Sequence, residues 1–184
     1  MRKLWLLMNI SLDGYFEAPG HDFSWSTRQN EAFSSEGSAQ VDAFLFGHRT
    51  YDMMRAFWPT PMAAEQAPEV AKVMNERQKY VVSHAPFEPG WSNVAVLDGD
   101  AIAKVRALKE QPGGSIGIFG SNTLCVGLLQ EGLLDEVQVV VNPILLGRGS
   151  SFFAGIPEWV KLTLKESRAF PTGVVLLSYS INSN

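Results

Sequence analysis

The sequence FGHRTY at residues 46–51 is the stretch that decides the fold of this chain. It follows a mostly apolar run at 41–45, which predicts a strand, and it begins an amphipathic stretch, which predicts a helix. Gly47 lets the backbone approach a ligand closely, and the free amides at a helix start point toward negative charge. Thr50 is expected to cap the helix and to donate to a phosphate oxygen. The stretch therefore predicts an anion site between a strand and a helix.

A second stretch of the same kind, IGIFGSNTL, occupies residues 116–124. Its Gly120 again follows an apolar run and precedes a helix-forming segment. Glycine also ends strands for purely structural reasons, so each stretch alone has two interpretations. Two such turns at the ends of two strands together predict a dinucleotide bound across the edge of a sheet.

Length and composition restrict the class of protein. The 184 residues are expected to form a single domain, 1–184, and 46% hydrophobic with 18% charged residues is typical of a folded chain. The net charge of −4 provides no basic face for nucleic acid. Cys125 is the one cysteine and is interpreted as a core thiol. The apolar run at 4–8 is too short for a signal peptide or a membrane span, so we expect a cytoplasmic protein without a membrane partner.

Strand-like and helix-like stretches alternate along the chain, and turn residues separate them. Strands are predicted at residues 4–10, 41–46, 79–83, 94–97, 115–119, 135–143, 161–170 and 174–181. Helices are predicted at residues 51–57, 65–77, 101–111 and 123–131, with a loop and a short helix at 20–37. Asp100 is expected to cap the helix that follows it. The order predicts one α/β domain whose sheet is mainly parallel at first and ends in antiparallel strands.

These motifs, in this order and nearly end to end, resemble the dihydrofolate reductase fold. More closely, the chain resembles the reductase domain of the bifunctional riboflavin-biosynthesis deaminase-reductase and its stand-alone relatives. The resemblance rests on SLDG at 11–14, GHRTY at 47–51, KYVVS at 79–83, GS at 120–121, GLLDE at 132–136 and NPILLG at 142–147. It implies a three-layer fold with helices on both faces of the sheet. No deaminase zinc motif accompanies it.

The resemblance also implies an activity. Such enzymes use NADPH to reduce a small heterocycle, either a pterin or a ribosylaminopyrimidine such as 5-amino-6-(5-phosphoribosylamino)uracil. The alternative is a regulatory or ligand-binding protein that keeps the nucleotide fold without turnover. A homodimer is expected from the dimeric habit of these reductases and from the apolar residues Phe152, Phe153 and Trp159 near the C-terminal strands.

The resemblance assigns cofactor roles to matching positions. Met8 and Asn9 would offer backbone groups to the nicotinamide amide, and Phe16 would lie in the loop that covers the ring. The positions expected to hold the phosphates and the adenosine ribose are Gly47, His48, Arg49, Thr50, Ser83, His84, Gly120, Ser121, Asn122, Thr123 and Leu124.

The chain departs from the family pattern at two of these positions. His48 and His84 stand where relatives often carry arginine or lysine, so selection of NADPH over NADH is open. Arginine holds phosphate through a permanent charge and two parallel donors, and a neutral imidazole does neither. The histidines, including His21, show no metal-ligand spacing, and no metal site is predicted.

The sequence gives weaker indications of which residues bind the substrate. Asp13 is a candidate catalytic group that binds a substrate amino group, or else it bonds to the amides of its own turn. Glu31 is the second candidate, near the place of the acidic proton-relay residue in dihydrofolate reductases, or else a solvated helix residue. The candidate substrate contacts are Trp25, Phe57 and Trp58 for stacking, Asn142 for the pocket floor and Arg148 for a phosphate. The purely structural alternatives are core or dimer contacts for the aromatic residues and a surface-loop position for the arginine.

Overall fold

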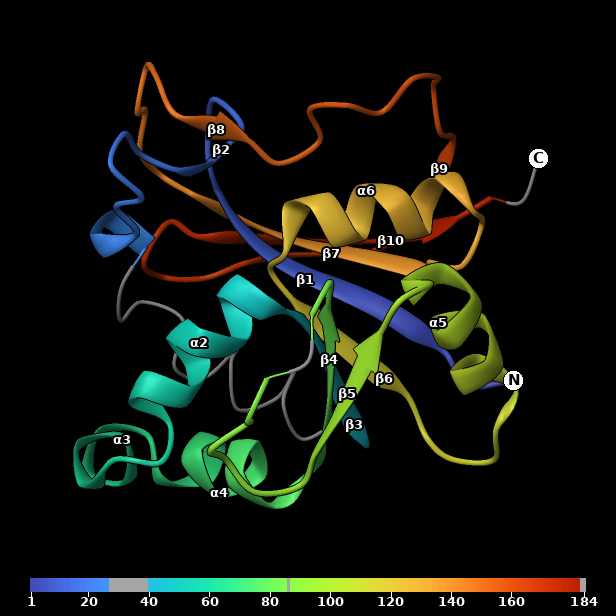
Figure 1. Ribbon diagram of the computed structural model, residues 1–184. Helices are drawn as coiled ribbons and strands as arrows, with labels where there is room; N and C mark the ends of the chain where they lie inside the picture. The colour runs from blue at the N-terminus through green and yellow to red at the C-terminus, as the bar shows by residue number, and fades with distance from the viewer. Residues whose placement is uncertain (27–39, 86, 183–184) are drawn as a thin grey trace.

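An eight-stranded sheet forms the centre of the protein, with the strand order β5-β4-β3-β6-β1-β7-β10-β9 (Figure 1). The computed structural model describes residues 1–26, 40–85 and 87–182. Neighbouring strands are parallel from β5 to β7, whereas β7, β10 and β9 are antiparallel. The strands span Leu4–Ser11 (β1), Ala43–Gly47 (β3), Gln78–Ser83 (β4), Val94–Asp98 (β5), Ile116–Phe119 (β6), Glu136–Asn142 (β7), Leu162–Ala169 (β9) and Val175–Ile181 (β10). The predicted α/β sheet with an antiparallel C-terminal edge is confirmed.

Strand β1 lies inside the sheet because it is apolar on both faces. It pairs with β6 on one side and with β7 on the other. Trp5 and Leu7 belong to one core cluster, and Leu4, Leu6 and Met8 belong to the cluster on the opposite face. All five side chains are at most 8% exposed. Burial on both faces thus explains the unbroken hydrophobic run of this strand, as expected for a parallel strand in the middle of a sheet.

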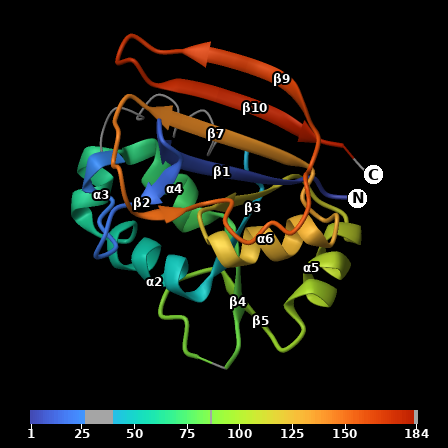
Figure 2. The ribbon, with the colours of Figure 1, turned by 90° about the horizontal axis from the view of Figure 1, so that it is seen from above.

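Helices cover both faces of the sheet (Figure 2). Val105 and Leu128 of α5 and α6 pack into one core cluster, and Tyr51 and Met74 of α2 and α4 pack into the other. Asp100 caps α5 as predicted, accepting from an amide of the first turn at 3.0 Å. The helices span His48–Phe57 (α2), Pro61–Gln66 (α3), Pro68–Glu76 (α4), Ala101–Glu110 (α5) and Asn122–Gln130 (α6).

The single helix predicted at residues 65–77 is wrong, because the structure has α3 and α4 there. Pro68 disfavours the helical conformation at the residue before it, and Ala67 accordingly has φ −148° and ψ 67°. Helix α3 begins earlier than predicted, since Thr60 caps it by accepting from the Ala63 amide at 3.3 Å.

A second, two-stranded sheet was not predicted. Strand β2 (Tyr15–Glu17) pairs antiparallel with β8 (Ser150–Ser151), and Figure 1 shows the two side by side. The residue after β8, Phe152, is 1% exposed. It therefore belongs to the core, whereas the expectation from the sequence was an open surface. Of the segment 20–37, the structure describes a short 3-10 helix at Ser24–Ser26, and residues 27–39 lie outside the description. No helix among the described residues has the length and apolar character needed to cross a membrane.

Candidate active site

The two glycine turns meet at the carboxyl ends of the parallel strands, because β3 and β6 are neighbouring parallel strands. The Gly47 amide donates to Ser121 Oγ at 2.8 Å, and this hydroxyl donates to Thr50 Oγ1 at 2.8 Å. A Cβ on Gly47 would lie 2.9 Å from Ser121 Oγ, so glycine permits this close approach. Gly120 and Ser121 have φ of +82° and +70°, and this left-handed pair turns the chain into α6. Ser121 therefore joins the two predicted motifs.

The predicted capping role of Thr50 is wrong. Helix α2 begins at His48 rather than at residue 51, and its N-cap is Gly47, which has no side chain to cap it. Ser121 is the N-cap of α6, and its hydroxyl makes no capping bond there either. Both helices therefore begin at the same sheet edge without a capping side chain on their first amides. Such amides are available to an anion.

A cavity of about 690 Å³ opens at this edge of the sheet. Its lining includes twelve of the fourteen positions predicted to bind the cofactor. These are Met8, Asn9, Phe16, Gly47, His48, Arg49, Thr50, Gly120, Ser121, Asn122, Thr123 and Leu124. The fold thus gathers residues from three separate parts of the chain around one space, and their contacts with a cofactor stay predictions.

Ser83 and His84, the other two predicted cofactor residues, do not line the cavity. The Ser83 hydroxyl donates to the Ala85 carbonyl at 2.7 Å and lies 3.2 Å from His48 Nδ1. The His48 ring also stacks on Phe87, with centroids 4.2 Å apart. His84 is exposed. Among the residues that the structure describes, Ser83 consequently contacts the cavity lining through His48, which it helps to hold in place.

Asp13 faces the loop after β7 and not the cavity. Its carboxylate accepts from Ser11 Oγ at 2.6 Å and from the amides of Gly147 at 2.7 Å and Leu146 at 3.1 Å. The Ser11 hydrogen bond, aided by these amides, holds the pKa of Asp13 below its ordinary value. The two amides belong to the distant loop after β7 and not to the turn of Asp13, so this side chain ties its turn to that loop and does not line the cavity. A catalytic role for Asp13 stays a prediction. Glu31, the other catalytic candidate, lies outside the described residues.

Of the five predicted substrate residues, Trp58 alone lines the cavity. Phe57 lies beside it, with its ring centroid 5.0 Å from the Trp58 ring in a T-shaped contact. Asn142 is buried and donates to carbonyl groups of β1 and β7 at 3.2 Å, so it braces the sheet edge instead of forming a pocket floor. Arg148 is exposed on its loop. The Trp25 indole N–H is buried and has no hydrogen-bond partner among the described residues.

Glu17 is a cavity residue that the sequence did not reveal. This β2 glutamate is 4% exposed and accepts from Ser150 Oγ at 2.7 Å. Its other oxygen lies 3.2 Å from the Arg49 guanidinium and 3.1 Å from His21 Nδ1. Burial alone would raise the pKa of Glu17, but the bonds from Ser150 and His21 and the charge of Arg49 outweigh it and lower the pKa. Glu17 therefore stays ionised and orients Arg49.

Four apolar side chains of α2 and α4 also line the cavity and were missed. They are Met53, Met54, Val70 and Met74. In the sequence these residues are indistinguishable from the buried stripe of an amphipathic helix. A glutamate directly after two aromatic residues, as at position 17, is a similarly weak signal.

Known proteins resemble this chain in sequence and in structure. YyaP of Bacillus subtilis strain 168, an uncharacterized protein, is 27% identical over 98% of this chain and 96% of its own length. The deaminase and 5-amino-6-(5-phosphoribosylamino)uracil reductase of Thermotoga maritima has a TM-score of 0.74 and 15% identity, over 98% of this chain and 57% of that one. A dihydrofolate reductase of Enterococcus faecalis complexed with NADP(H) has a TM-score of 0.68 and 13% identity, over 98% and 97% of the two chains.

The two solved structures share the fold of this chain. The family described as the RibD C-terminal domain matches residues 2–176, which include both glycine turns and the β2–β8 pair. This match covers nearly the whole chain, and the protein therefore belongs to the RibD C-terminal domain family.

Proposed function

We propose that this protein is an NADPH-dependent oxidoreductase that reduces a small heterocycle, either a pterin or a ribosylaminopyrimidine. The family and the reductase structures that share its fold support a reductase-type function. The observation that carries the proposal is the Gly47–Ser121–Thr50 junction beside a cavity of about 690 Å³. The volume lies within the usual range of small-molecule sites, about 300–1,000 Å³.

The residues present fit a dinucleotide. Helices α2 and α6 begin at the junction without side-chain caps, and their first amides can donate hydrogen bonds to a pyrophosphate. Arg49 extends from the first turn of α2 into the cavity lining, where a phosphate would meet its guanidinium. Met8 and Asn9, in the second half of β1, line the same cavity.

The chemistry follows from this placement. NADPH, when bound, supplies a hydride to the substrate, and the substrate takes the matching proton from water or from a side chain. The protein binds the phosphates, orients the two reactants and excludes water. Phe16 contributes to the last task, because its ring packs on Phe152 at 5.6 Å while it lines the cavity.

The first test is Arg49→Ala. We expect it to weaken NADPH binding by about 10–100-fold, or about 1.5–3 kcal/mol, because a charge-assisted contact is lost. The dissociation constant is measured by quenching of NADPH fluorescence. Arg55→Ala is the matched control, since Arg55 lies on the same helix but bonds to the Pro89 carbonyl at 3.1 Å and does not line the cavity. An unchanged dissociation constant in Arg49→Ala would contradict the assignment.

Turnover separates a reductase from a protein that only binds the nucleotide. A reductase oxidises NADPH when a pterin or a ribosylaminopyrimidine is added, and the loss of NADPH absorbance reports the rate. Quenching of NADPH fluorescence without oxidation by any such acceptor would favour the non-catalytic alternative.

We also propose that the protein forms a homodimer. Strand β9 pairs with β10 on one side only, and nearly all of it is exposed. Leu162 and Leu164 on it are 42% and 52% exposed, and nearby Trp159 is 92% exposed. Apolar side chains of this size on an open strand are typical of a contact surface. Light scattering at micromolar concentration should give twice the chain mass of 20.3 kDa, and a monomer mass would refute the dimer.

A further inference from the structure

Lys79 on β4 is a lysine whose whole side chain is buried, with an exposed fraction of 0%. Its ammonium lies at the end of α4 and donates to three carbonyl oxygens. These belong to Met74 at 2.8 Å, Arg77 at 2.7 Å and Asn75 at 3.3 Å. The last carbonyls of a helix have no partner within the helix. Lys79 therefore caps α4 at its C-terminal end, and each of its three N–H groups has an acceptor.

Trp91 and Asn75 complete the surroundings of this ammonium. The centre of the Trp91 ring is 4.6 Å from Lys79 Nζ, and the indole N–H of Trp91 donates to Asn75 Oδ1 at 2.8 Å. The side-chain amide of Asn75 donates in turn to the carbonyl of Trp58, the C-cap of α2, at 3.0 Å. Lys79, Asn75 and Trp91 thus form one connected group, which we name the α4 cap network.

Both helix ends held by the α4 cap network carry cavity residues. Met74 lines the cavity, and its own carbonyl accepts from Lys79. Trp58 also lines the cavity, its carbonyl accepts from Asn75, and its indole donates to Met54 Sδ at 3.2 Å. Met54, Trp58 and Met74 pack in the same core cluster. The network therefore joins one buried ammonium to three lining side chains on two helices.

Burial distinguishes Lys79 from an ordinary helix cap. Lysines at helix ends usually keep the ammonium in water while the carbon chain packs on the protein. Asn93 shows how a neutral side chain closes the same helix end, since its amide donates to the carbonyls of Asn75 at 3.3 Å and Glu76 at 3.0 Å. A buried ammonium costs free energy of desolvation. It is a poor choice for stability alone, and its fixed donors favour one arrangement of the helix end.

We propose that Lys79 is a positioning residue for the cavity, because its ammonium fixes the last turn of α4 and, through Asn75, the C-terminal end of α2. The positions of Met54, Trp58 and Met74 in the lining then depend on this ammonium. The inference goes beyond the proposed reductase activity, since it concerns the shape of the cavity and applies to any ligand bound there.

Removal of one proton should loosen the α4 cap network. A neutral amine has two N–H donors for three carbonyls and no charge to attract the Trp91 ring. Burial lowers the pKa of Lys79 from an ordinary 10.5 to about 8. The change is therefore expected in mildly alkaline solution.

The neighbouring titratable groups belong to classes that change charge outside this range. Carboxylic acids titrate below about pH 5, and phenols and guanidinium groups titrate at about pH 10 or above. Burial raises the pKa of Tyr51, whose ring centre is 5.9 Å from that of Trp91. The charged or titratable groups on the adjoining elements include Glu76 and Arg77 at the end of α4, Tyr51 and Arg55 of α2, Tyr80 of β4 and Asp98 of β5.

Methionine methyl signals test the positioning role without a ligand. The six methionines are labelled with carbon-13 at the methyl group, and their NMR signals are followed from about pH 7 to about pH 9.5. The signals of Met74 and of Met54 should both shift with a midpoint near pH 8, because the Trp58 ring moves with its carbonyl. Met62, 58% exposed on α3, is the internal control. A cap with only a local role would leave the Met54 signal constant, and that result would overturn the proposal.

Two variants hold the α4 cap network in one state. Lys79→Arg keeps its charge at every pH of the titration, so the Met54 and Met74 signals should stay at their neutral-pH positions. Lys79→Gln is uncharged and should give, at neutral pH, the positions that the natural protein reaches in alkali. Lys72→Gln, at an exposed position of α4 outside the cavity lining, is the matched control and should keep the natural titration. A Met54 signal that still titrates in Lys79→Arg would assign the shift to another group and contradict the proposal. If neither Lys79 variant folds, the titration of the natural protein decides alone.

NADPH binding gives a readout that a purely structural lysine would not change. The dissociation constant from fluorescence quenching should rise about threefold or more over the same pH range in the natural protein, because the displaced lining fits the nucleotide less well. It should stay constant relative to this in Lys79→Arg, which also corrects for the titration of histidines. Equal pH profiles in the two proteins would refute the positioning role and leave the reductase proposal intact. If NADPH does not bind at all, the reductase proposal fails, and the Met54 titration still decides the role of Lys79.

Discussion

Gly149→Ala is expected to lower the free energy of unfolding by about 3–4 kcal/mol, from overpacking and backbone strain together. A Cβ at this position would lie 2.1 Å from the Glu17 carbonyl oxygen, at a φ of +153°. Both the Cβ and the oxygen are fixed to backbone, so β8 must move away from β2. Urea unfolding followed by circular dichroism measures the loss.

Gly147→Ala is the matched control for this prediction. Gly147 also has a positive φ, +70°, but a Cβ there would have no neighbour within 4 Å. Its cost is the left-handed strain alone, about 1–2 kcal/mol. The Gly149 variant should additionally weaken NADPH binding, because the Ser150 hydroxyl that orients Glu17 moves with β8. Equal losses in the two variants would show that the close approach of β2 and β8 does not matter.

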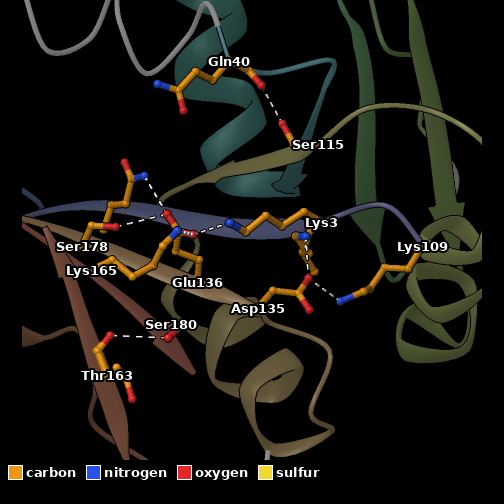
Figure 3. Close-up of polar contacts among 12 residues, drawn as sticks. Lys3, Gln40, Lys109, Ser115, Asp135, Glu136, Thr163, Lys165, Ser178 and Ser180 are labelled. Atoms are coloured by element: carbon orange, nitrogen blue, oxygen red, sulfur yellow. Dashed lines mark hydrogen bonds and ion pairs between the residues drawn. The ribbon is translucent and has the colours of Figure 1, made fainter. Parts of the chain in front are cut away.

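An ion cluster around the buried carboxylate of Glu136 is expected to control stability in acid (Figure 3). Glu136 on β7 is 5% exposed, and its carboxylate accepts from Lys3, from Lys165 and, at 3.1 Å, from Gln138 Nε2 and Ser178 Oγ. Burial would raise its pKa, but the hydrogen bonds from Lys165, Lys3 and Gln138 outweigh burial and lower the pKa to about 2. The cluster connects the edge strand β9 to the centre of the sheet.

The sign of the pH effect follows from this lowered pKa. The unfolded chain protonates Glu136 near the ordinary value of 4.5, whereas the folded protein does so near 2. The ion cluster therefore contributes its full stability above about pH 4.5 and loses it as the pH falls toward about 2. A difference of this size corresponds to about 3 kcal/mol.

Glu136→Gln should remove this dependence. We expect the unfolding free energies of the natural protein and this variant to differ by about 3 kcal/mol near neutral pH and to converge as the pH falls to about 2. Glu166→Gln, on the exposed edge strand, is the control and should change stability by less than about 0.5 kcal/mol. A gap between natural protein and Glu136→Gln that is constant with pH would contradict the assignment.

The sequence by itself determined the sheet and the position of the glycine turns. The apolar run of β1 and the alternation of strands and helices are local patterns, and they predicted the parallel sheet with its antiparallel edge. The turns at Gly47 and Gly120 were predicted to lie at one edge because parallel strands end on the same side. The structure brings them together through Ser121.

Only the tertiary structure decided which side chains face the cavity. Strands β2 and β8 have three and two residues, too few to show a period, and the bond from Ser150 to Glu17 joins residues 133 positions apart. The contact of Asp13 with the loop at Gly147 could not be predicted either, since these two residues are distant in the chain. Met54 and Met74 have the sequence pattern of ordinary core residues, yet both line the cavity. Local patterns record which residues are apolar, whereas the meeting of distant segments determines which of them remain uncovered.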